Sequence, residues 1–120
     1  MALPVNKNIS MVRGDTLVEI LTLEDADNQP FDLTEYEVKM DIKLSKDAPP
    51  MLSLVEGDGL TKQGTSGIIT IKIDPAKTND FAFSGNTVSY VYDVEINQIL
   101  NGSRRTIVEG NFVIYKDVTR

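Results

Sequence analysis

The sequence of 120 residues predicts an all-β protein: an antiparallel β-sandwich, or flattened barrel, of about seven strands with at most one short helical turn. Apolar residues recur at every second position in several segments, which is the period of a half-buried strand. Residues that form turns or break strands separate these segments about every 8 to 15 residues. We predict a single domain over residues 1–120, with a flexible amino-terminal arm at 1–8 and a polar tail at 116–120.

The segment 87–115 predicts a long β-hairpin around which the other strands pack. Its first half places apolar side chains on one face, namely Val88, Tyr90, Tyr92, Val94 and Ile96. Its second half does the same with Val108, Phe112 and Ile114. Asn101-Gly102 separates the halves, and both residues tolerate the positive φ of a tight two-residue hairpin turn. We expect the two tyrosines to enter the core.

A two-residue turn at this place fixes which residues of the hairpin face one another. It sets Tyr92 against Asn111, so that the two apolar rows fall on opposite faces of the sheet. One extra residue in the second strand brings Tyr92 opposite Phe112 instead. We therefore expect a β-bulge near Glu109-Gly110, where glycine tolerates a bulge, and the alternative is a loop with an odd number of residues.

Residues 9–12 predict a short strand that ends at Arg13-Gly14-Asp15. This triplet matches an integrin-binding tripeptide in letters, but we interpret it as a turn that leads into a strand at 16–23. That strand has Val18 and Ile20 on one face, and Leu17, Leu21 and Leu23 with Glu19 on the other. Apolar residues on both faces predict a strand that is buried between layers or covered at an interface.

Residues 24–30 predict a polar turn. Asp25 and Asp27 match the start of a calcium loop, but Gln29 and the missing glycine and terminal glutamate argue against bound calcium. A half-buried antiparallel strand follows, in which Tyr36, Val38, Met40, Ile42 and Leu44 alternate with charged residues. Pro49-Pro50 interrupts the sheet, because proline donates no ladder hydrogen bond.

Two further strands are predicted at 51–55 and 68–73, joined by a flexible connection at 56–67. The connection contains Gly57, Gly59, Gly64 and Gly67, but it lacks the strand-to-helix context and the Gly-Lys-Ser/Thr sequence of a phosphate cradle. Asp74 and Pro75 predict one helical turn that extends to about Asp80. Phe81 and Phe83 then plug one end of the fold.

Composition excludes several classes of function. The chain has no Cys and no His, so disulfides, thiolate metal sites and histidine-dependent catalysis are excluded. The net charge of −6 argues against a nucleic-acid binder, and we expect Arg104-Arg105 to be a solvated hairpin tip. No apolar run is long enough to span a membrane, and the first residues lack a secretory signal, so we expect synthesis in a cytoplasm.

Several short motifs resemble small β-sandwich proteins of tailed bacteriophages, among them the amino-terminal domain of the baseplate upper protein type. The matching pieces are Met11-Val12-Arg13-Gly14-Asp15-Thr16, Asp25-Ala26-Asp27, Pro30-Phe31-Asp32-Leu33-Thr34, Tyr92-Asp93-Val94-Glu95-Ile96, Glu109-Gly110 and Val118-Thr119-Arg120. Asn28 stands where that pattern commonly has Gly. The resemblance implies a virion structural protein that attaches baseplate, tail or fibre parts, with other virion proteins as partners. It also implies a homo-oligomer or a larger assembly, and no catalytic, cofactor or metal residues.

Two other classes of function were weighed against this one. A capsid-decorating or carbohydrate-binding, adhesin-like sandwich is the alternative, but sugar sites usually display exposed aromatic rings. Trp is absent, and three of the four tyrosines fall on predicted core faces, which leaves Tyr115. An enzyme needs paired groups in a cleft, whereas Asp93 and Glu95 lie on the outer face of one strand. We therefore expect a non-enzymatic binding module.

Overall fold

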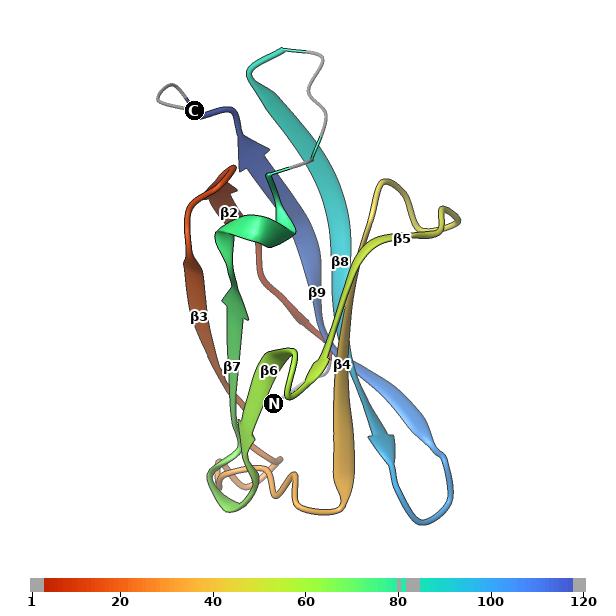
Figure 1. Ribbon diagram of the computed structural model, residues 1–120. Coiled ribbons are helices and arrows are strands. Elements are labelled where there is room, and N and C mark those ends of the chain that lie inside the picture. The colour runs from red at the N-terminus through yellow and green to blue at the C-terminus, as the bar shows by residue number, and fades with distance from the viewer. Residues whose placement is uncertain (1–3, 80, 82–84, 118–120) are drawn as a thin grey trace.

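The computed structural model describes residues 4–79, 81 and 85–117, and within them the protein is built from strands and two short 3₁₀ turns (Figure 1). The elements are β1 (Val5–Asn6), β2 (Ile9–Val12), β3 (Leu17–Thr22), β4 (Tyr36–Lys43), β5 (Pro50–Glu56), β6 (Gly59–Gln63), η1 (Gly64–Ser66), β7 (Ile68–Ile73), η2 (Pro75–Lys77), β8 (Thr87–Gln98) and β9 (Arg104–Tyr115). The all-β prediction is confirmed. The described residues form nine strands rather than about seven, because the arm and the glycine-rich connection also contain strands.

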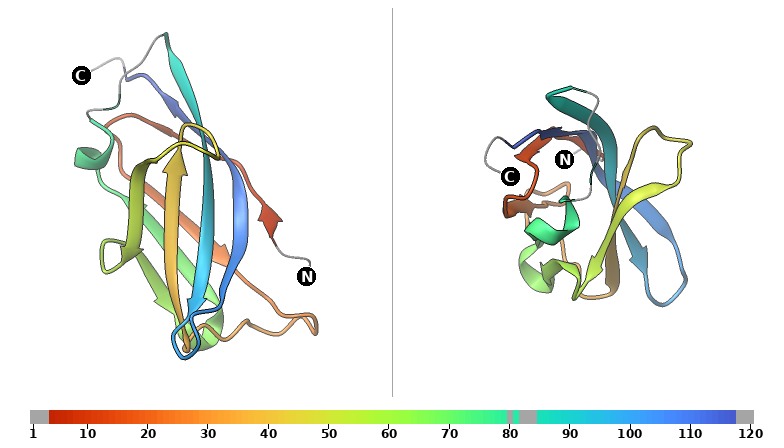
Figure 2. Two further views of the ribbon diagram at one scale, coloured as in Figure 1. Left: turned by 90° about the vertical axis from the view of Figure 1, so that its right-hand side faces the viewer. Right: turned by 45° about the horizontal axis from the view of Figure 1, so that its top comes forward.

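A single mixed sheet contains all nine strands and curls into a half-barrel (Figures 1 and 2). Its order is β1-β9-β8-β4-β5-β6-β7-β3, and β2 also pairs with β9. The pairs β1/β9, β2/β9 and β5/β6 are parallel, and the other pairs are antiparallel. The predicted antiparallel sandwich is therefore not found. One sheet curls around its own core in place of two sheets that pack face to face.

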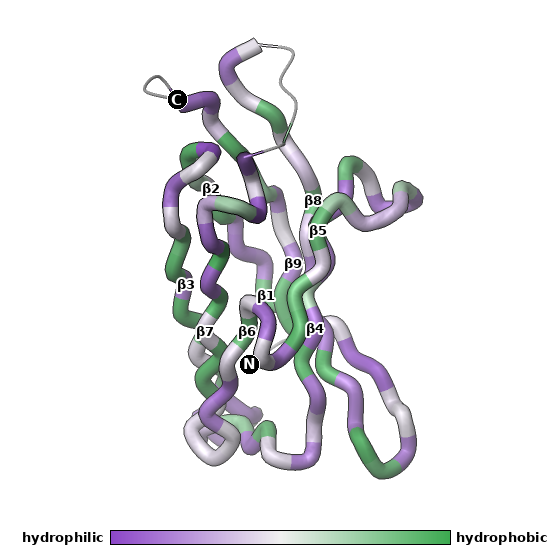
Figure 3. The backbone as a smooth tube through the Cα atoms, in the orientation of Figure 1, coloured by the Kyte–Doolittle hydropathy of each residue, from purple (hydrophilic) through white to green (hydrophobic). Residues whose placement is uncertain are grey.

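The core lies on the inner face of this sheet, and the period of two along the strands produces it. On β4, Val38, Met40 and Ile42 are buried while Glu37 and Lys39 are exposed, as predicted (hydropathy is shown in Figure 3). The strand ends at Lys43, so Leu44 is exposed and not inward as predicted. On β8 and β9 the buried row is formed by Tyr90, Tyr92, Val94, Ile96, Ile107, Val108, Phe112 and Ile114.

The central hairpin is confirmed, but its register differs from the prediction. Tyr92 lies opposite Gly110, not opposite Phe112, and the bulge leaves Ile107 without a partner on β8 instead of falling near Glu109-Gly110. The prediction of a two-residue turn is also wrong. The backbone N–H of Gln98 donates to the carbonyl of Ser103 at 2.8 Å, so four residues form the loop. Both apolar rows still share the inner face, which is what the bulge was expected to achieve.

The observed register follows from the path of the amino-terminal chain. The Lys7 carbonyl approaches Gly110 so closely that a Cβ atom there would lie 2.1 Å from its oxygen. The phenol of Tyr92, on the opposite strand, donates a hydrogen bond of 2.6 Å to the same carbonyl. Glycine at 110 is required because the backbone of the arm occupies the space of its side chain. Segment 1–8, expected to be a flexible arm, thus contains β1, which pairs with β9.

The end of the half-barrel near η2 is closed by contacts between segments far apart in the sequence. The guanidinium of Arg13 donates to Asp117 Oδ1 at 2.8 Å and to the Phe81 carbonyl at 3.1 Å. Phe81 packs edge-to-face on Tyr90, with ring centroids 5.5 Å apart. The first residues of the predicted polar tail therefore belong to the fold, since Asp117 is buried. Asp80, Phe83 and residues 118–120 lie outside the described residues.

The connection at 56–67 is also more ordered in structure than predicted. It contains β6, which pairs with β5 in parallel and with β7 in the antiparallel sense. Gly57 and Gly59 both have positive φ, of 86° and 100°, which allows the tight loop that joins β5 to the parallel strand β6. A helical turn follows Asp74 as predicted, but η2 ends at Lys77 rather than near Asp80, and the Asp74 side chain makes no capping hydrogen bond.

Candidate interaction surface

The two edges of the sheet differ, and β3 forms the open one. Within the described residues β3 pairs only with β7. The backbone N–H of Leu23 donates to the Gly67 carbonyl at 2.8 Å, in line with the β3/β7 register. Hydrogen-bonded residues alternate along an antiparallel strand, so Leu17, Glu19 and Leu21 bond to β7. The backbone groups of Val18, Ile20 and Thr22 therefore point away from the sheet.

The side chains on the outer face of this edge carry little charge. Val18 and Ile20 are 56% and 59% exposed. Beside them on β7 stand Ile68, Thr70 and Lys72, paired with Thr22, Ile20 and Val18 respectively. We call these six residues the β3–β7 outer face. Exposed β-branched side chains on an open edge are unusual, because proteins commonly protect such edges with charged side chains, proline or bulges. This surface is the strongest candidate for protein–protein contact.

A shallow groove separates β3 from the amino-terminal strand β1. It has a volume of about 170 Å³ and is lined by Val5, Lys7, Ile20, Leu21, Thr22, Leu23 and Val108. The Lys7 ammonium bridges the groove to the Glu19 carboxylate at 2.9 Å. A side-chain ion pair therefore spans the groove where a closed barrel would have a ladder of backbone hydrogen bonds, which leaves space beside the edge of β3.

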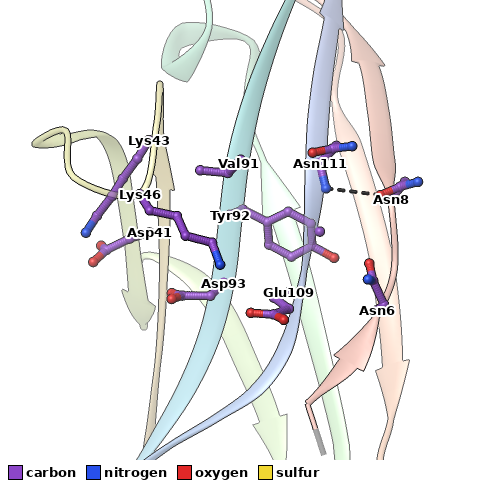
Figure 4. Close-up of a pocket in the computed structure, with 11 residues that line it drawn as sticks. Asn6, Asn8, Asp41, Lys43, Lys46, Val91, Tyr92, Asp93, Glu109 and Asn111 are labelled. Carbon is purple, nitrogen blue, oxygen red and sulfur yellow. Dashed lines mark hydrogen bonds between the residues drawn. The ribbon is translucent and has the colours of Figure 1, made fainter.

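The second hollow lies on the outer face of β4, β8, β9 and β1 (Figure 4). It has a volume of about 370 Å³ and is lined by Asn6, Asn8, Asp41, Lys43, Lys46, Val91, Tyr92, Asp93, Glu109, Gly110 and Asn111. Asp41, Asp93 and Glu109 stand directly opposite one another on three adjacent strands, and we call them the acidic row. Partial burial, followed by the charges of Glu95, Asp41 and Glu109, raises the pKa of Asp93.

The geometry of the acidic row differs from that of a metal-binding cluster. Among the described residues, no three His, Cys, Asp or Glu side chains are arranged to hold a metal ion. Lys46 extends towards Asp93, and the amide of Asn8 accepts a hydrogen bond from the Asn111 backbone at 3.1 Å (Figure 4). Asp93 and Glu95 lie on the outer face of β8, as the sequence predicted. The hollow is thus a polar surface of mixed charge.

The Arg13-Gly14-Asp15 triplet forms a turn, as interpreted from the sequence. Gly14 has a φ of 81°, and its N–H donates to the buried Thr78 hydroxyl at 2.9 Å. The N–H of Asp15 donates to the Val12 carbonyl and closes the turn. Arg13 is occupied by its bonds to Asp117 and the Phe81 carbonyl. The triplet therefore fastens the β2–β3 connection to the end of the half-barrel.

The acidic loop 24–30 uses its first carboxylate to hold its own backbone. Asp25 Oδ1 accepts hydrogen bonds from the N–H groups of Asp27 and Gln29, at 2.9 and 3.0 Å. Asn28 has a φ of 61°, in the left-handed region that asparagine tolerates better than most residues. Asparagine at this position therefore fits the turn that the loop requires.

Aromatic side chains contribute little to the described surface. Tyr90 and Tyr92 are buried, and Tyr36 packs against Phe31 with ring centroids 5.8 Å apart. Tyr115 is exposed, as expected, but it does not line either hollow. The tip of the β8–β9 hairpin exposes Leu100 to 90%, next to the exposed Arg104 and Arg105.

Sequence reasoning identified part of these surfaces. The apolar residues on both faces of β3 predicted a strand that is buried between layers or covered at an interface. Val18 and Ile20 are exposed, so burial between layers is not found, and the interface stays a prediction. The acidic row was missed, because its three members lie far apart in the sequence and meet only through the register of β4, β8 and β9.

Comparison with known proteins adds no family to these observations. No protein-family model matches the chain, and no curated protein matches it either. Over the residues described by the structure, no helix has the length and apolar character needed to cross a membrane.

Proposed function

We propose that the protein is a non-enzymatic structural component of a tailed-bacteriophage virion, which attaches baseplate, tail or fibre parts through protein–protein contacts. The observation that carries this proposal is the open edge of β3 with its exposed Val18 and Ile20. The sequence motifs that resemble phage β-sandwich proteins supply the virion context. In this proposal the protein is made in the host cytoplasm and is then incorporated into the particle beside other virion proteins.

Two features favour assembly over catalysis or sugar binding. The polar hollow presents no exposed aromatic ring on which a sugar could stack, since the Tyr92 ring faces the core. Its carboxylates lie in a row on an open sheet surface. The Ser53 hydroxyl donates to Asp41 Oδ1 at 2.6 Å, but this bond is exposed to solvent and is not enclosed in a cleft. An unprotected strand edge, in contrast, is a ready template for pairing with another chain.

Mass spectrometry of purified particles of the phage that encodes the chain tests this proposal. We expect the protein in washed particles at a fixed ratio to the major tail proteins. A phage that lacks the gene is then complemented with wild-type protein, with Ile20→Lys, or with Val55→Lys as a matched control at another exposed apolar residue. Only Ile20→Lys should fail to be incorporated. Protein that accumulates in infected cells but is absent from particles contradicts the proposal.

A further inference from the structure

The edge of β3 is longer and less protected than the opposite edge of the sheet, and its one charged residue is Glu19, whose side chain pairs with Lys7 across the groove. At the opposite edge both strands are short: β1 has two residues and follows Pro4, which has no N–H to offer a partner strand, and β2 has four residues. β3 has six residues, and its outward positions contain neither proline, charge nor a bulge. Long, uncharged edges pair readily with further strands, so an edge of this kind is kept in a stable protein when something covers it.

The hydrogen-bonding pattern limits how a second strand can pair with β3. Three residues, Val18, Ile20 and Thr22, direct both backbone groups outwards. We propose that the strand that covers them is β3 of a second copy of this chain, antiparallel to the first, with Ile20 on the two-fold axis. In this register all three outward residues are paired, because Val18 meets Thr22 of the second copy and Thr22 meets its Val18. The proposal rests on the assembly function proposed above and names its partner.

Charge favours a second copy as the occupant. The chain carries a net charge of −6, so two copies repel each other unless they meet where acidic residues are few. On the β3–β7 outer face Lys72 is the one charged member, and its ammonium lies 3.9 Å from the Asp74 carboxylate. On the inner face of β3, Glu19 of each copy is paired with Lys7 of the same copy at 2.9 Å. In the proposed register each Lys72 lines up with Ile68 of the other copy, so like charges do not face each other across the axis.

The side chains are also self-complementary. The central row runs Thr70, Ile20, then Ile20 and Thr70 of the second copy, which places β-branched residues side by side on one surface. Cross-strand pairs of this kind stabilise a sheet, and opposed like charges destabilise it. An isologous contact of this type closes as a dimer and does not propagate. Larger assemblies then need another surface of the chain.

Solution mass as a function of concentration is the first test. Multi-angle light scattering should show a monomer at low concentration and a dimer at high concentration for the wild type. Ile20→Lys should weaken dimerisation by about a hundredfold, because two ammonium groups would meet on the axis. Val55→Lys, at an exposed residue of β5, should dimerise like the wild type. A wild type that stays monomeric overturns the proposal, as does a dimer that Ile20→Lys leaves intact.

A second pair of variants separates the contribution of the backbone N–H at the strand edge from that of the Ile20 side chain on the outer face. Ile20→Pro removes the outward N–H but leaves the β3–β7 ladder, since residue 20 does not bond to β7. We expect it to abolish the dimer, whereas Ile20→Ala, which keeps the N–H, should retain dimerisation with a Kd raised by about tenfold. Circular dichroism establishes that each variant is folded. If Ile20→Pro does not fold, the dimerisation of Ile20→Lys decides whether the β3 dimer exists.

Cysteine cross-linking tests the register, because the natural chain has no cysteine. Ile20→Cys introduces a single thiol on the axis, where paired Cα atoms lie about 5.5 Å apart, within disulfide range. We expect a covalent dimer under mild oxidation, and a mixture of Val18→Cys and Thr22→Cys should cross-link more than either variant alone. Leu100→Cys, at the exposed hairpin tip, is the control. Cross-linking that is faster at residue 100 than at residue 20 overturns the proposal.

The two proposals fail in different ways. A chain that is incorporated into particles but stays monomeric in solution overturns the β3 dimer and leaves the virion function standing. A chain that dimerises through β3 but is absent from particles overturns the virion function alone.

Discussion

The two sides of the half-barrel share one core but differ in what they present outwards. On the β9 side, β1 and β2 cover the strand edge, and the outer face carries the acidic row Asp41, Asp93 and Glu109. On the β3 side, the edge is open and the outer face is mainly Val, Ile and Thr. Folding constrains the inward residues of both sides equally, since both must fill the core. The outward residues are therefore free to differ: they are charged on the β9 side, as on a solvated surface, and mainly apolar on the β3 side, where we propose a partner.

The largest effect on stability should come from truncating an inward residue of β3, and truncating an outward residue of the same strand is the comparison. Leu21→Ala should lower the free energy of unfolding by about 3 kcal/mol, because Leu21 is only 5% exposed and its removal leaves a cavity. Ile20→Ala, measured at low protein concentration, should cost at most about 0.5 kcal/mol. Urea denaturation of both variants checks the contrast. Equal losses would show that Ile20 serves the fold of the monomer and not an external contact.

The pairing of β1 with β9 should be disrupted by one added methyl group at Gly110. Gly110→Ala should destabilise the protein by about 2–3 kcal/mol, because its Cβ would lie 2.1 Å from the Lys7 oxygen. β1 should then leave β9, which exposes the part of the β9 edge that β2 does not cover. Hydrogen exchange at the Asn111 amide, which donates to Asn8, should accelerate.

Gly57 is a matched control that separates the steric clash at Gly110 from backbone strain. Gly57→Ala has open space around the new Cβ but a φ of 86°, so we expect a cost of about 1 kcal/mol and unchanged exchange at Asn111. If Gly110→Ala behaves like Gly57→Ala, the Lys7 carbonyl is not what requires glycine at 110.

Loss of the hydrogen bond from Tyr92 to Lys7 should weaken the attachment of β1 to β9 less than Gly110→Ala does. Tyr92→Phe should cost about 1 kcal/mol at neutral pH, since the Lys7 carbonyl loses its donor. Tyr115→Phe, at an exposed ring, should change stability little. Thermal denaturation compares the two variants, and equal melting temperatures would remove the phenol from the account of how β1 is held.

The same phenol predicts a dependence on alkaline pH. Burial, and then the Glu19 charge, raise the pKa of Tyr92 from its ordinary 10.0 to about 12. Between these values the folded state keeps the proton while the unfolded state loses it, so stability falls as pH rises. The stability gap between wild type and Tyr92→Phe should therefore narrow from pH 10 towards pH 12.

The sequence predicted the features that depend on local periodicity. Burial of Met40 and Tyr92 follows from alternation within a single strand, and the placement of Val18 and Ile20 on the face of β3 opposite Leu21 follows from the same alternation. These features need no knowledge of which strands become neighbours.

Features set by distant pairing escaped prediction. β1 is too short to show a period, and it forms because β9 offers an edge more than a hundred residues away in sequence, with Val5 opposite Val108. β6 lies among glycines that favour turns, and its pairing with β7 decides its conformation. The acidic row depends on the register of β4, β8 and β9, which the bulge at Ile107 offsets by one residue.

The acidic row should show the smallest effect, with the opposite sign. Asp41 and Glu109 flank Asp93 directly, and opposed like charges destabilise a sheet. Asp93→Asn should stabilise the protein by about 0.5 kcal/mol at neutral pH, after allowance for solvent screening.

The pKa of Asp93 is raised by burial and by neighbouring carboxylates, so the folded state takes up its proton before the unfolded state does. The wild type therefore recovers stability as pH falls through the folded pKa, and the advantage of Asp93→Asn should fade towards pH 4. Asp47→Asn, at an exposed residue of the β4–β5 loop, should show no such advantage. Loss of stability in Asp93→Asn at neutral pH would mean that the carboxylate binds its neighbours, Lys46 in particular, more strongly than the acidic row repels it.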